Sequence, residues 1–186
     1  VSENGNYMAA AAMGQDGGSF TSSLQIYKLT SDALQADAAL SGGVYELGTV
    51  DGRFCAATDK ALCFVKADGS VSTYDYQGAN LARCSINGGK FAAVLLENYS
   101  SGGLTHLATV NTGEEIAALT VDSQVLDLSA AGRYVAVLYT SSLVIYDRNL
   151  RQCAVLEDVN FARRVLMRSD GSAVLAGTNF ASLYLP

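Results

Sequence analysis

Short stretches of apolar residues follow one another along the whole chain, and small polar residues and turn signals separate them. Stretches such as 24–27 (Leu-Gln-Ile-Tyr) and 143–146 (Leu-Val-Ile-Tyr) have the length and the β-branched and aromatic composition of strands. Asp-Gly and Asn-Gly pairs, which favour the tight turns of antiparallel hairpins, lie between them, for example at Asp68-Gly69. The pattern therefore predicts an all-β chain of antiparallel hairpins.

A short phrase recurs along the chain: a glycine, any residue, an aromatic residue, an apolar residue and an alanine. In its first four copies Tyr or Phe stands two positions after the glycine and Ala four positions after it, whereas the fifth copy has Ala and Leu there. The five copies begin at Gly5, Gly52, Gly89, Gly132 and Gly171. Recurrence at about 40 residues indicates one supersecondary unit copied along the chain.

Each glycine phrase is followed by a second strand-like phrase, and further strand-like stretches lie before and after this pair. Residues 79–86, 124–129 and 162–168 precede a glycine phrase, and residues 71–74, 114–119 and 152–156 follow a second phrase. Each unit is therefore expected to be a four-stranded antiparallel meander. Residues 31–40 would also suit a short helix, but they fall where the repeat places a strand, and we expect a strand there.

Four-stranded units that repeat at this length are typical of β-propeller blades, which bury their faces against neighbouring blades. The glycine phrase, followed by Leu143-Val144-Ile145-Tyr146-Asp147, resembles WD40-like and YVTN-like propeller repeats, although the Trp-Asp and Gly-His pairs of WD40 repeats are absent. Residues 165–171 and 182–186 are most similar in texture to uncharacterised bacterial propellers, a domain of unknown function. That resemblance implies an extracytoplasmic protein, tethered to the membrane by a segment outside this sequence. A cytoplasmic protein is the alternative.

The repeat divides the chain into five approximate blades, at residues 1–43, 44–78, 79–123, 124–161 and 162–186. The first blade lacks its opening strand and the last lacks its closing strand, so the strands divide into three, twelve and three. Because four to five blades are fewer than most closed propellers have, we expect a C-terminal portion of a larger propeller. Exposed blade edges and faces would favour pairing with a second copy.

Charge and cysteine spacing limit the chemistry. Twelve Lys and Arg against eighteen Asp and Glu give a net charge of −6, which argues against nucleic acid as a partner. The four cysteines show no CxxC or His-paired spacing, so neither a zinc site nor a redox motif is predicted. Cys55 and Cys63 flank a turn centred on Asp59, and a cross-strand disulfide between them is the alternative to two buried thiols.

Candidate binding residues follow from the blade architecture. The connections from the second to the third strand, and from the fourth strand to the next blade, lie on one face of a propeller, and that face usually binds. Residues 14–22 and 97–104 are expected to be the longer second-to-third loops. The candidates on these two loops are Asp16, Phe20, Asn98 and Tyr99.

The only histidine, His106, is the fifth candidate, because it stands where other copies have Leu24, Leu62 or Leu143. The sequence shows no partner carboxylate or second ligand for it, so neither metal nor general-base chemistry is predicted. Gly-x-Ser-x-Gly is absent, and one histidine gives little basis for a catalytic triad. No catalytic residue, metal or cofactor is therefore expected.

The sequence favours a non-enzymatic propeller module that presents a loop face to a protein, a peptide or a glycan. One alternative is an enzyme or cofactor-dependent propeller whose active site lies partly outside this sequence. Another is a structural spacer in a cell-surface protein. An enzyme should have a deep axial pocket where polar side chains from several blades meet, whereas an interaction module should have a shallow face.

Overall fold

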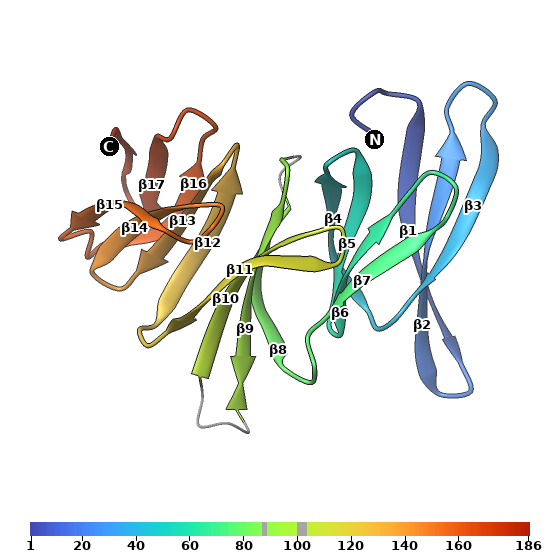
Figure 1. Cartoon of the computed structure of the whole chain (residues 1–186), viewed down its shortest axis with the longest axis horizontal. Coiled ribbons are helices and arrows are strands. Elements are labelled where there is room, and N and C mark those ends of the chain that lie inside the picture. The colour runs from blue at the N-terminus through green and yellow to red at the C-terminus, as the bar shows by residue number, and fades with distance from the viewer. Residues whose placement is uncertain (87–88, 100–103) are drawn as a thin grey trace.

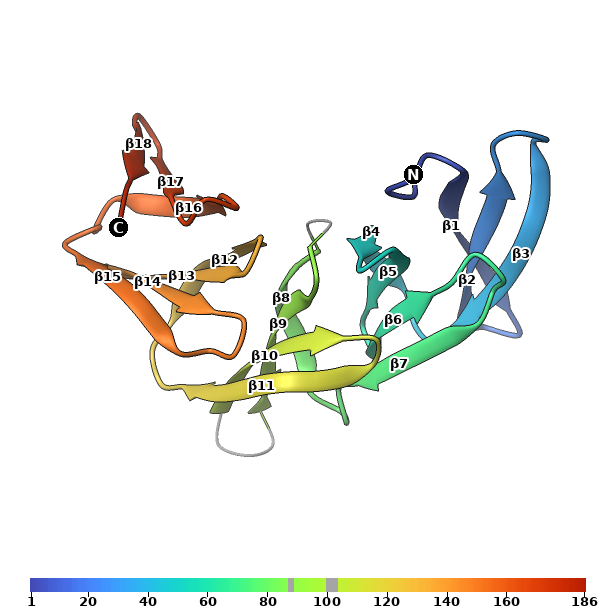
Figure 2. The same ribbon diagram turned by 45° about the horizontal axis from the view of Figure 1, so that its top comes forward.

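Five antiparallel β-sheets follow one another along the chain. The computed structural model describes residues 1–86, 89–99 and 104–186. The sheets lie side by side from the first at the right of Figure 1 to the fifth at the left, and Figure 2 shows that they form an open arc. The first strands of the second to fifth sheets lie on the inner side of this arc, and the last strands of the first four sheets lie on its outer side. We call the former the inner strands.

Each sheet is a meander in which consecutive strands are neighbours. The first sheet contains β1 (Tyr7–Asp16), β2 (Ser19–Lys28) and β3 (Ala33–Leu40), and the second contains β4 (Val44–Val50), β5 (Arg53–Thr58), β6 (Ala61–Val65) and β7 (Val71–Asp75). The third contains β8 (Asn80–Ser85), β9 (Ala92–Asn98), β10 (Leu104–Asn111) and β11 (Glu114–Val121). The fourth contains β12 (Val125–Ala131), β13 (Tyr134–Tyr139), β14 (Ser142–Asp147) and β15 (Gln152–Glu157), and the fifth contains β16 (Ala162–Met167), β17 (Ala173–Gly177) and β18 (Ala181–Tyr184).

The glycine phrase works by closing a hairpin. Between β4 and β5, Asp51 and Gly52 both have positive φ, 49° and 75°, and they join the paired residues Val50 and Arg53. Two residues with positive φ form the turn whose twist matches that of the flanking strands. The glycine thus marks the turn, and the aromatic and alanine positions that follow it lie on the second strand.

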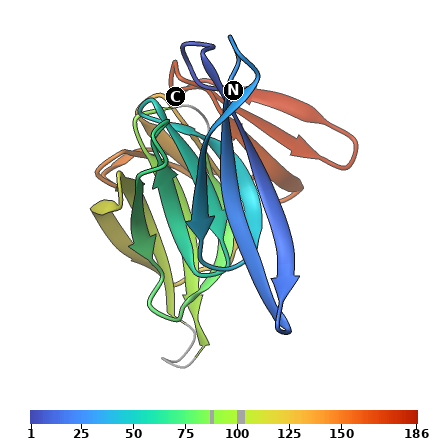
Figure 3. The same ribbon diagram turned by 90° about the vertical axis from the view of Figure 1, so that its right-hand side faces the viewer.

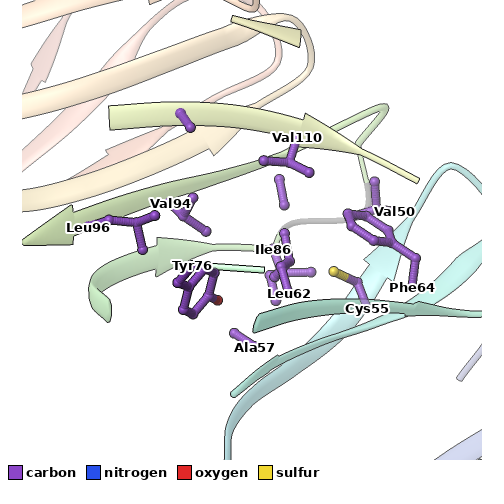
Figure 4. Packing of buried hydrophobic residues seen from close by; sticks show 12 residues of the cluster. Val50, Cys55, Ala57, Leu62, Phe64, Tyr76, Ile86, Val94, Leu96 and Val110 are labelled. Carbon is purple, nitrogen blue, oxygen red and sulfur yellow. The ribbon is translucent and has the colours of Figure 1, made fainter. Parts of the chain in front are cut away.

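The core consists of apolar layers between adjacent sheets. Residues on β5 alternate between two layers: Cys55 and Ala57 face the third sheet, whereas Phe54 packs with Leu24 and Ile26 of the first sheet. Figure 4 shows the layer between the second and third sheets. Both faces of an internal sheet are therefore buried, as in a propeller blade.

Adjacent inner strands are also joined by polar side chains. A carboxylate or hydroxyl on one inner strand accepts a backbone N–H from the next inner strand or, at Ile86, from the residue directly after it. The pairs are Glu46 with Ile86 (3.1 Å), Ser85 with Ala130 (2.9 Å), Asp127 with Val165 (2.9 Å) and Ser129 with Met167 (3.0 Å). These bonds hold successive sheets in register on the inner side of the arc.

The architecture confirms an all-β partial β-propeller. The described strands divide into three, twelve and three, and residues 33–40 form a strand. Within the described ranges, no helix has the length and apolar character needed to cross a membrane.

The expectation of a long loop at residues 14–22 was wrong, whereas Cys55 and Cys63 are two buried thiols, as the sequence favoured. Residues 14–22 are not a long loop, because β1 and β2 pair along ten residues each and turn only at Gly17 and Gly18. Cys55 and Cys63 form no disulfide: Cys55 pairs with Phe64, and Cys63 pairs with Ala56. The two thiols therefore lie on opposite faces of the sheet, since directly paired residues point to the same face and successive residues alternate.

Candidate functional site

One side of the arc carries the connections that the sequence indicated as the binding face. Because strands in a meander alternate in direction, the β1–β2, β5–β6 and β9–β10 connections emerge on the same side as β3–β4, β7–β8 and β11–β12. Figures 1 and 3 show the β1–β2 turn at the lower side of the molecule, away from both termini. We call this side the loop face, and cavities between adjacent sheets open on it.

The first cavity, the polar groove, lies between the third and fourth sheets and has a volume of about 670 Å³. Its polar lining comes from the third sheet and from the β11–β12 connection, and includes Asn80, Arg83, Glu97, Tyr99, Asp122 and Gln124, whereas the fourth sheet contributes Val125. The hydroxyl of Tyr99 donates a hydrogen bond to the Glu97 carboxylate, and this bond raises the pKa of Tyr99 above its usual range. The Tyr99 hydroxyl is therefore protonated at neutral pH.

Arg83 lies in this groove at a β-bulge of β8. Each inner strand carries one bulge near its start, and the residue after the bulge is Glu46, Arg83, Asp127 or Arg164 in the second to fifth sheets. Glu46 and Asp127 accept N–H groups of the next inner strand. A guanidinium has no acceptor atom. Arg83 instead donates to the carbonyl of Ala82 (2.8 Å) and lies exposed in the polar groove.

The second cavity, the apolar groove, lies between the first and second sheets and has a volume of about 760 Å³. Met13 and Tyr45, which line it, are 66% and 71% exposed. Its acidic group is satisfied within the protein, because the Asp59 carboxylate accepts the N–H of Gly43 (2.6 Å) and pairs with Lys60 (3.4 Å). Large apolar side chains are therefore what this groove offers to a ligand.

The third cavity, the side pocket, lies between the second and third sheets and has a volume of about 450 Å³. Tyr74 donates a hydrogen bond to Glu115 across the two sheets (2.7 Å), and Nε2 of His106 lies 3.5 Å from the same carboxylate. Burial first, and then the Glu115 carboxylate, raise the pKa of Tyr74. The expectation that His106 has no partner carboxylate was wrong, because Glu115 pairs with it.

The structure also corrects the repeat position of His106. The alanines of three glycine phrases, Ala9, Ala93 and Ala136, each pair with a residue on the following strand. Two positions before that paired residue, the following strand carries a fully buried leucine: Leu24, Leu107 and Leu143, respectively. Leu107 is thus the core leucine of the third sheet. His106 is the preceding residue and points to the other face of the strand.

Of the five sequence candidates, three line cavities of the loop face. Asn98 and His106 line the side pocket, and Tyr99 lines the polar groove. Asp16 and Phe20 lie beside the turn of the β1–β2 hairpin, and their side chains are outside the described part of the structure.

Sequence reasoning missed most residues of the two grooves. Arg83 and Tyr45 lie on inner strands, and the repeat alone does not show which residues of an inner strand are exposed. Asp122 and Gln124 belong to a connection between blades, which the blade architecture assigns to the loop face. The assignment of this connection to the loop face could have indicated Asp122 and Gln124 as candidates from the sequence.

Comparison with known proteins shows the fold. No family model matches the sequence, and no curated protein matches it. Hsv2 of Kluyveromyces lactis, a β-propeller, superposes with a TM-score of 0.59 at 12% identity, over 95% of this chain and 61% of that one. BBS1N, solved in complex with ARL6DN, superposes with a TM-score of 0.52 at 10% identity, over 90% of this chain and 63% of that one. The chain thus spans less than two thirds of the length of these propellers.

Proposed function

We propose that this chain is a non-enzymatic recognition module that binds a protein or peptide through its loop face. The apolar groove is the observation that carries the proposal. Met13 and Tyr45 are largely exposed although they border a concave surface, and the groove between them has glycine walls at Gly14, Gly42 and Gly43. Exposed apolar surface of this kind marks interaction sites, and buried aromatic anchors dominate the affinity of many protein interfaces.

The arrangement of the cavities favours binding over catalysis. Each cavity described above is lined by two adjacent sheets, so polar groups from several blades do not meet in any of them. An enzyme would need such convergence around a reacting atom. The structural neighbour BBS1N was solved in complex with a protein, which supports a protein partner for a propeller of this kind.

A phage-displayed library of random peptides, selected against this chain, tests the proposal. We expect enriched peptides with an aromatic or large aliphatic anchor residue. The double variant Met13→Ser, Tyr45→Ser should weaken their binding at least about tenfold, because two large apolar contacts are lost. The matched control is Ile116→Ser, which changes an exposed apolar residue on the outer strand β11 and should leave binding unchanged.

Selection without any enriched peptide would contradict the proposal. Equal binding by wild type and by the groove double variant would do the same, because the peptides would then contact another surface. The thermal unfolding midpoint of each variant shows whether the fold is intact.

We also propose that the two end sheets pair head to tail with further copies of the chain. The outward face of the fifth sheet exposes Leu166 and Leu183, and that of the first sheet, nearest the viewer in Figure 3, exposes Met8 and Leu34. Their charges are complementary: residues 1–43 carry four acids and one lysine, whereas residues 162–186 carry three arginines and one aspartate. Opposite charges favour contact between unlike ends over contact between like ends.

A further inference from the structure

We infer that the polar groove between the third and fourth sheets binds a neutral oligosaccharide. This site is separate from the apolar groove, so the inference does not depend on a protein partner. It rests on the kinds of polar groups that line the groove, on the position of Tyr99, and on the exposed guanidinium of Arg83.

The groove presents hydrogen-bond donors and acceptors together. The carboxylates of Glu97 and Asp122 only accept, the guanidinium of Arg83 only donates, and the amide of Gln124 does both. A sugar hydroxyl is both a donor and an acceptor, and neighbouring hydroxyls on a ring need partners of both kinds. A lining of mixed donors and acceptors can therefore pair with the hydroxyl groups of an oligosaccharide and leave no polar group without a hydrogen bond.

Tyr99 supplies the apolar surface that a sugar ring also needs. Its side chain is 70% exposed, and its hydroxyl is bonded to Glu97, which fixes the ring at the wall of the groove. The face of an aromatic ring carries partial negative charge, and the C–H groups on one side of a pyranose carry partial positive charge. Stacking of a sugar on Tyr99 would leave the sugar hydroxyls directed at the polar lining.

Arg83 is available because it does not join the sheets. The corresponding residues in the second and fourth sheets, Glu46 and Asp127, each accept a hydrogen bond from the next inner strand. Arg83 cannot accept one, and its exposed guanidinium lies among the groove residues instead. The cation at the bulge of the third sheet thus contacts the groove, where the carboxylates of the second and fourth sheets contact the next sheet.

Charge distinguishes a neutral ligand from an anionic one. The groove contains one arginine and two carboxylates, Glu97 and Asp122, and the chain carries a net charge of −6. An anionic sugar or an acidic peptide would meet this negative field. A neutral oligosaccharide pays no such cost.

Titration calorimetry with neutral hexasaccharides of glucose (α-1,4 and β-1,4), xylose, mannose and N-acetylglucosamine tests the inference. We expect at least one series to bind with a micromolar to millimolar Kd. Tyr99→Ala and Arg83→Ala should each weaken that binding about tenfold or more, because each removes a contact worth about 1.4 kcal/mol or more. Tyr99→Phe keeps the ring and should weaken binding less than Tyr99→Ala.

Lys66→Ala is the matched control, because Lys66 is an exposed cation outside the loop face, in the β6–β7 connection. It should leave binding unchanged. Absence of binding by every series would overturn the inference, as would binding that neither Tyr99→Ala nor Arg83→Ala weakens in folded protein. Tighter binding of a hexagalacturonate, or displacement of the bound sugar by peptides that the apolar groove selects, would also overturn it.

Discussion

The carboxylate of Asp127 accepts a hydrogen bond from the backbone N–H of Val165, with 2.9 Å between Oδ2 and N. Its other oxygen lies 3.3 Å from the guanidinium of Arg164. Asp127 is buried on β12, and Val165 is buried on β16. One side chain therefore satisfies a buried N–H of the neighbouring sheet, and it ties the fifth sheet to the fourth at the inner strands.

Removal of this carboxylate should destabilise the protein. We expect Asp127→Ala to lower the free energy of unfolding by about 2–3 kcal/mol, because it leaves the buried N–H of Val165 without its acceptor. Urea denaturation measures the change. Asp37→Ala, at an exposed position on β3, is the control and should change stability by less than about 0.5 kcal/mol. Equal effects of the two substitutions would show that the bond to Val165 contributes nothing.

Gly48 on β4 marks a close approach between the second and third sheets. A Cβ at this position would lie 2.6 Å from Cγ2 of Ile86 and 2.8 Å from its carbonyl oxygen. Gly48→Ala should therefore push the inner strands apart and cost about 1–3 kcal/mol of stability, measured by urea denaturation. At Gly43 a Cβ would meet nothing within 4 Å. Gly43→Ala should consequently be tolerated, and a similar loss for both variants would contradict the close-packing argument.

The repeat was sufficient to predict the order of strands, because a strand follows each turn-forming glycine and the first four copies keep an aromatic residue and an alanine in a fixed register. It was insufficient where pairing shifts by one residue. The register of β9 with β10 makes Leu107, one residue after His106, the core leucine, and the register of β5 with β6 places Cys55 opposite Phe64. A shift of one residue changes which face a side chain occupies. The repeat position of His106 was wrong for this reason, and for the same reason the alternative of a Cys55–Cys63 disulfide is excluded.

The expectation of a long loop at residues 14–22 was wrong for another reason. The Gly and Ser content of this segment favours a loop by local preference, but each residue of β1 pairs with one of β2, including Gly14 with Thr21. Long-range pairing thus overrode the local preference. The blade architecture placed Tyr99 and Asp122 on the loop face, but it could not place them in one cavity with Arg83, because these residues come from separate strands and connections that the folded arrangement brings together.

Asp51 links the second and third sheets on the side opposite the loop face, and this link should depend on pH. Its carboxylate lies 2.6 Å from Nζ of Lys90 and 3.4 Å from Nδ2 of Asn111, and these bonds hold the pKa of Asp51 below its usual range. A lowered pKa in the folded state gives a stabilisation that is present at neutral pH and is lost as the pH falls through the lowered pKa, below about pH 4.

The effect should be small, under about 1 kcal/mol, because the pair is solvent-exposed. Urea midpoints of wild type and Asp51→Asn, measured from pH 6 to pH 2.5, test it. Asparagine tolerates the positive φ of position 51, so the backbone of the turn is retained. The stability difference between the two proteins should shrink as the pH falls. A constant difference would mean that the charge of Asp51 contributes nothing.

The four cysteines should differ in reactivity. Burial raises the pKa of the Cys55, Cys63 and Cys84 thiols, and a hydrogen bond to Glu46 raises that of Cys84 further. Cys153 is exposed. At pH 8 an aromatic disulfide reagent should therefore label Cys153 rapidly in native protein, and the other three thiols only in denaturant. Cys153→Ser should abolish the rapid phase, and a rapid phase that persists would show that a buried thiol is accessible.

The outward face of the fifth sheet offers the clearest test of self-association. Ile145, which pairs with Ala136, is 1% exposed because the fifth sheet covers it, whereas Leu183, which pairs with Val174 in the fifth sheet, is 52% exposed. Leu183 is thus an apolar side chain of the kind that packs between two sheets, but it is exposed on the outward face of the fifth sheet. We expect the sedimentation coefficient of the wild type to rise with concentration, and the double variant Leu166→Asp, Leu183→Asp to remain monomeric. Val155→Asp, on the outer strand β15, is the control and should still associate. Wild-type protein that stays monomeric at high concentration would refute head-to-tail pairing.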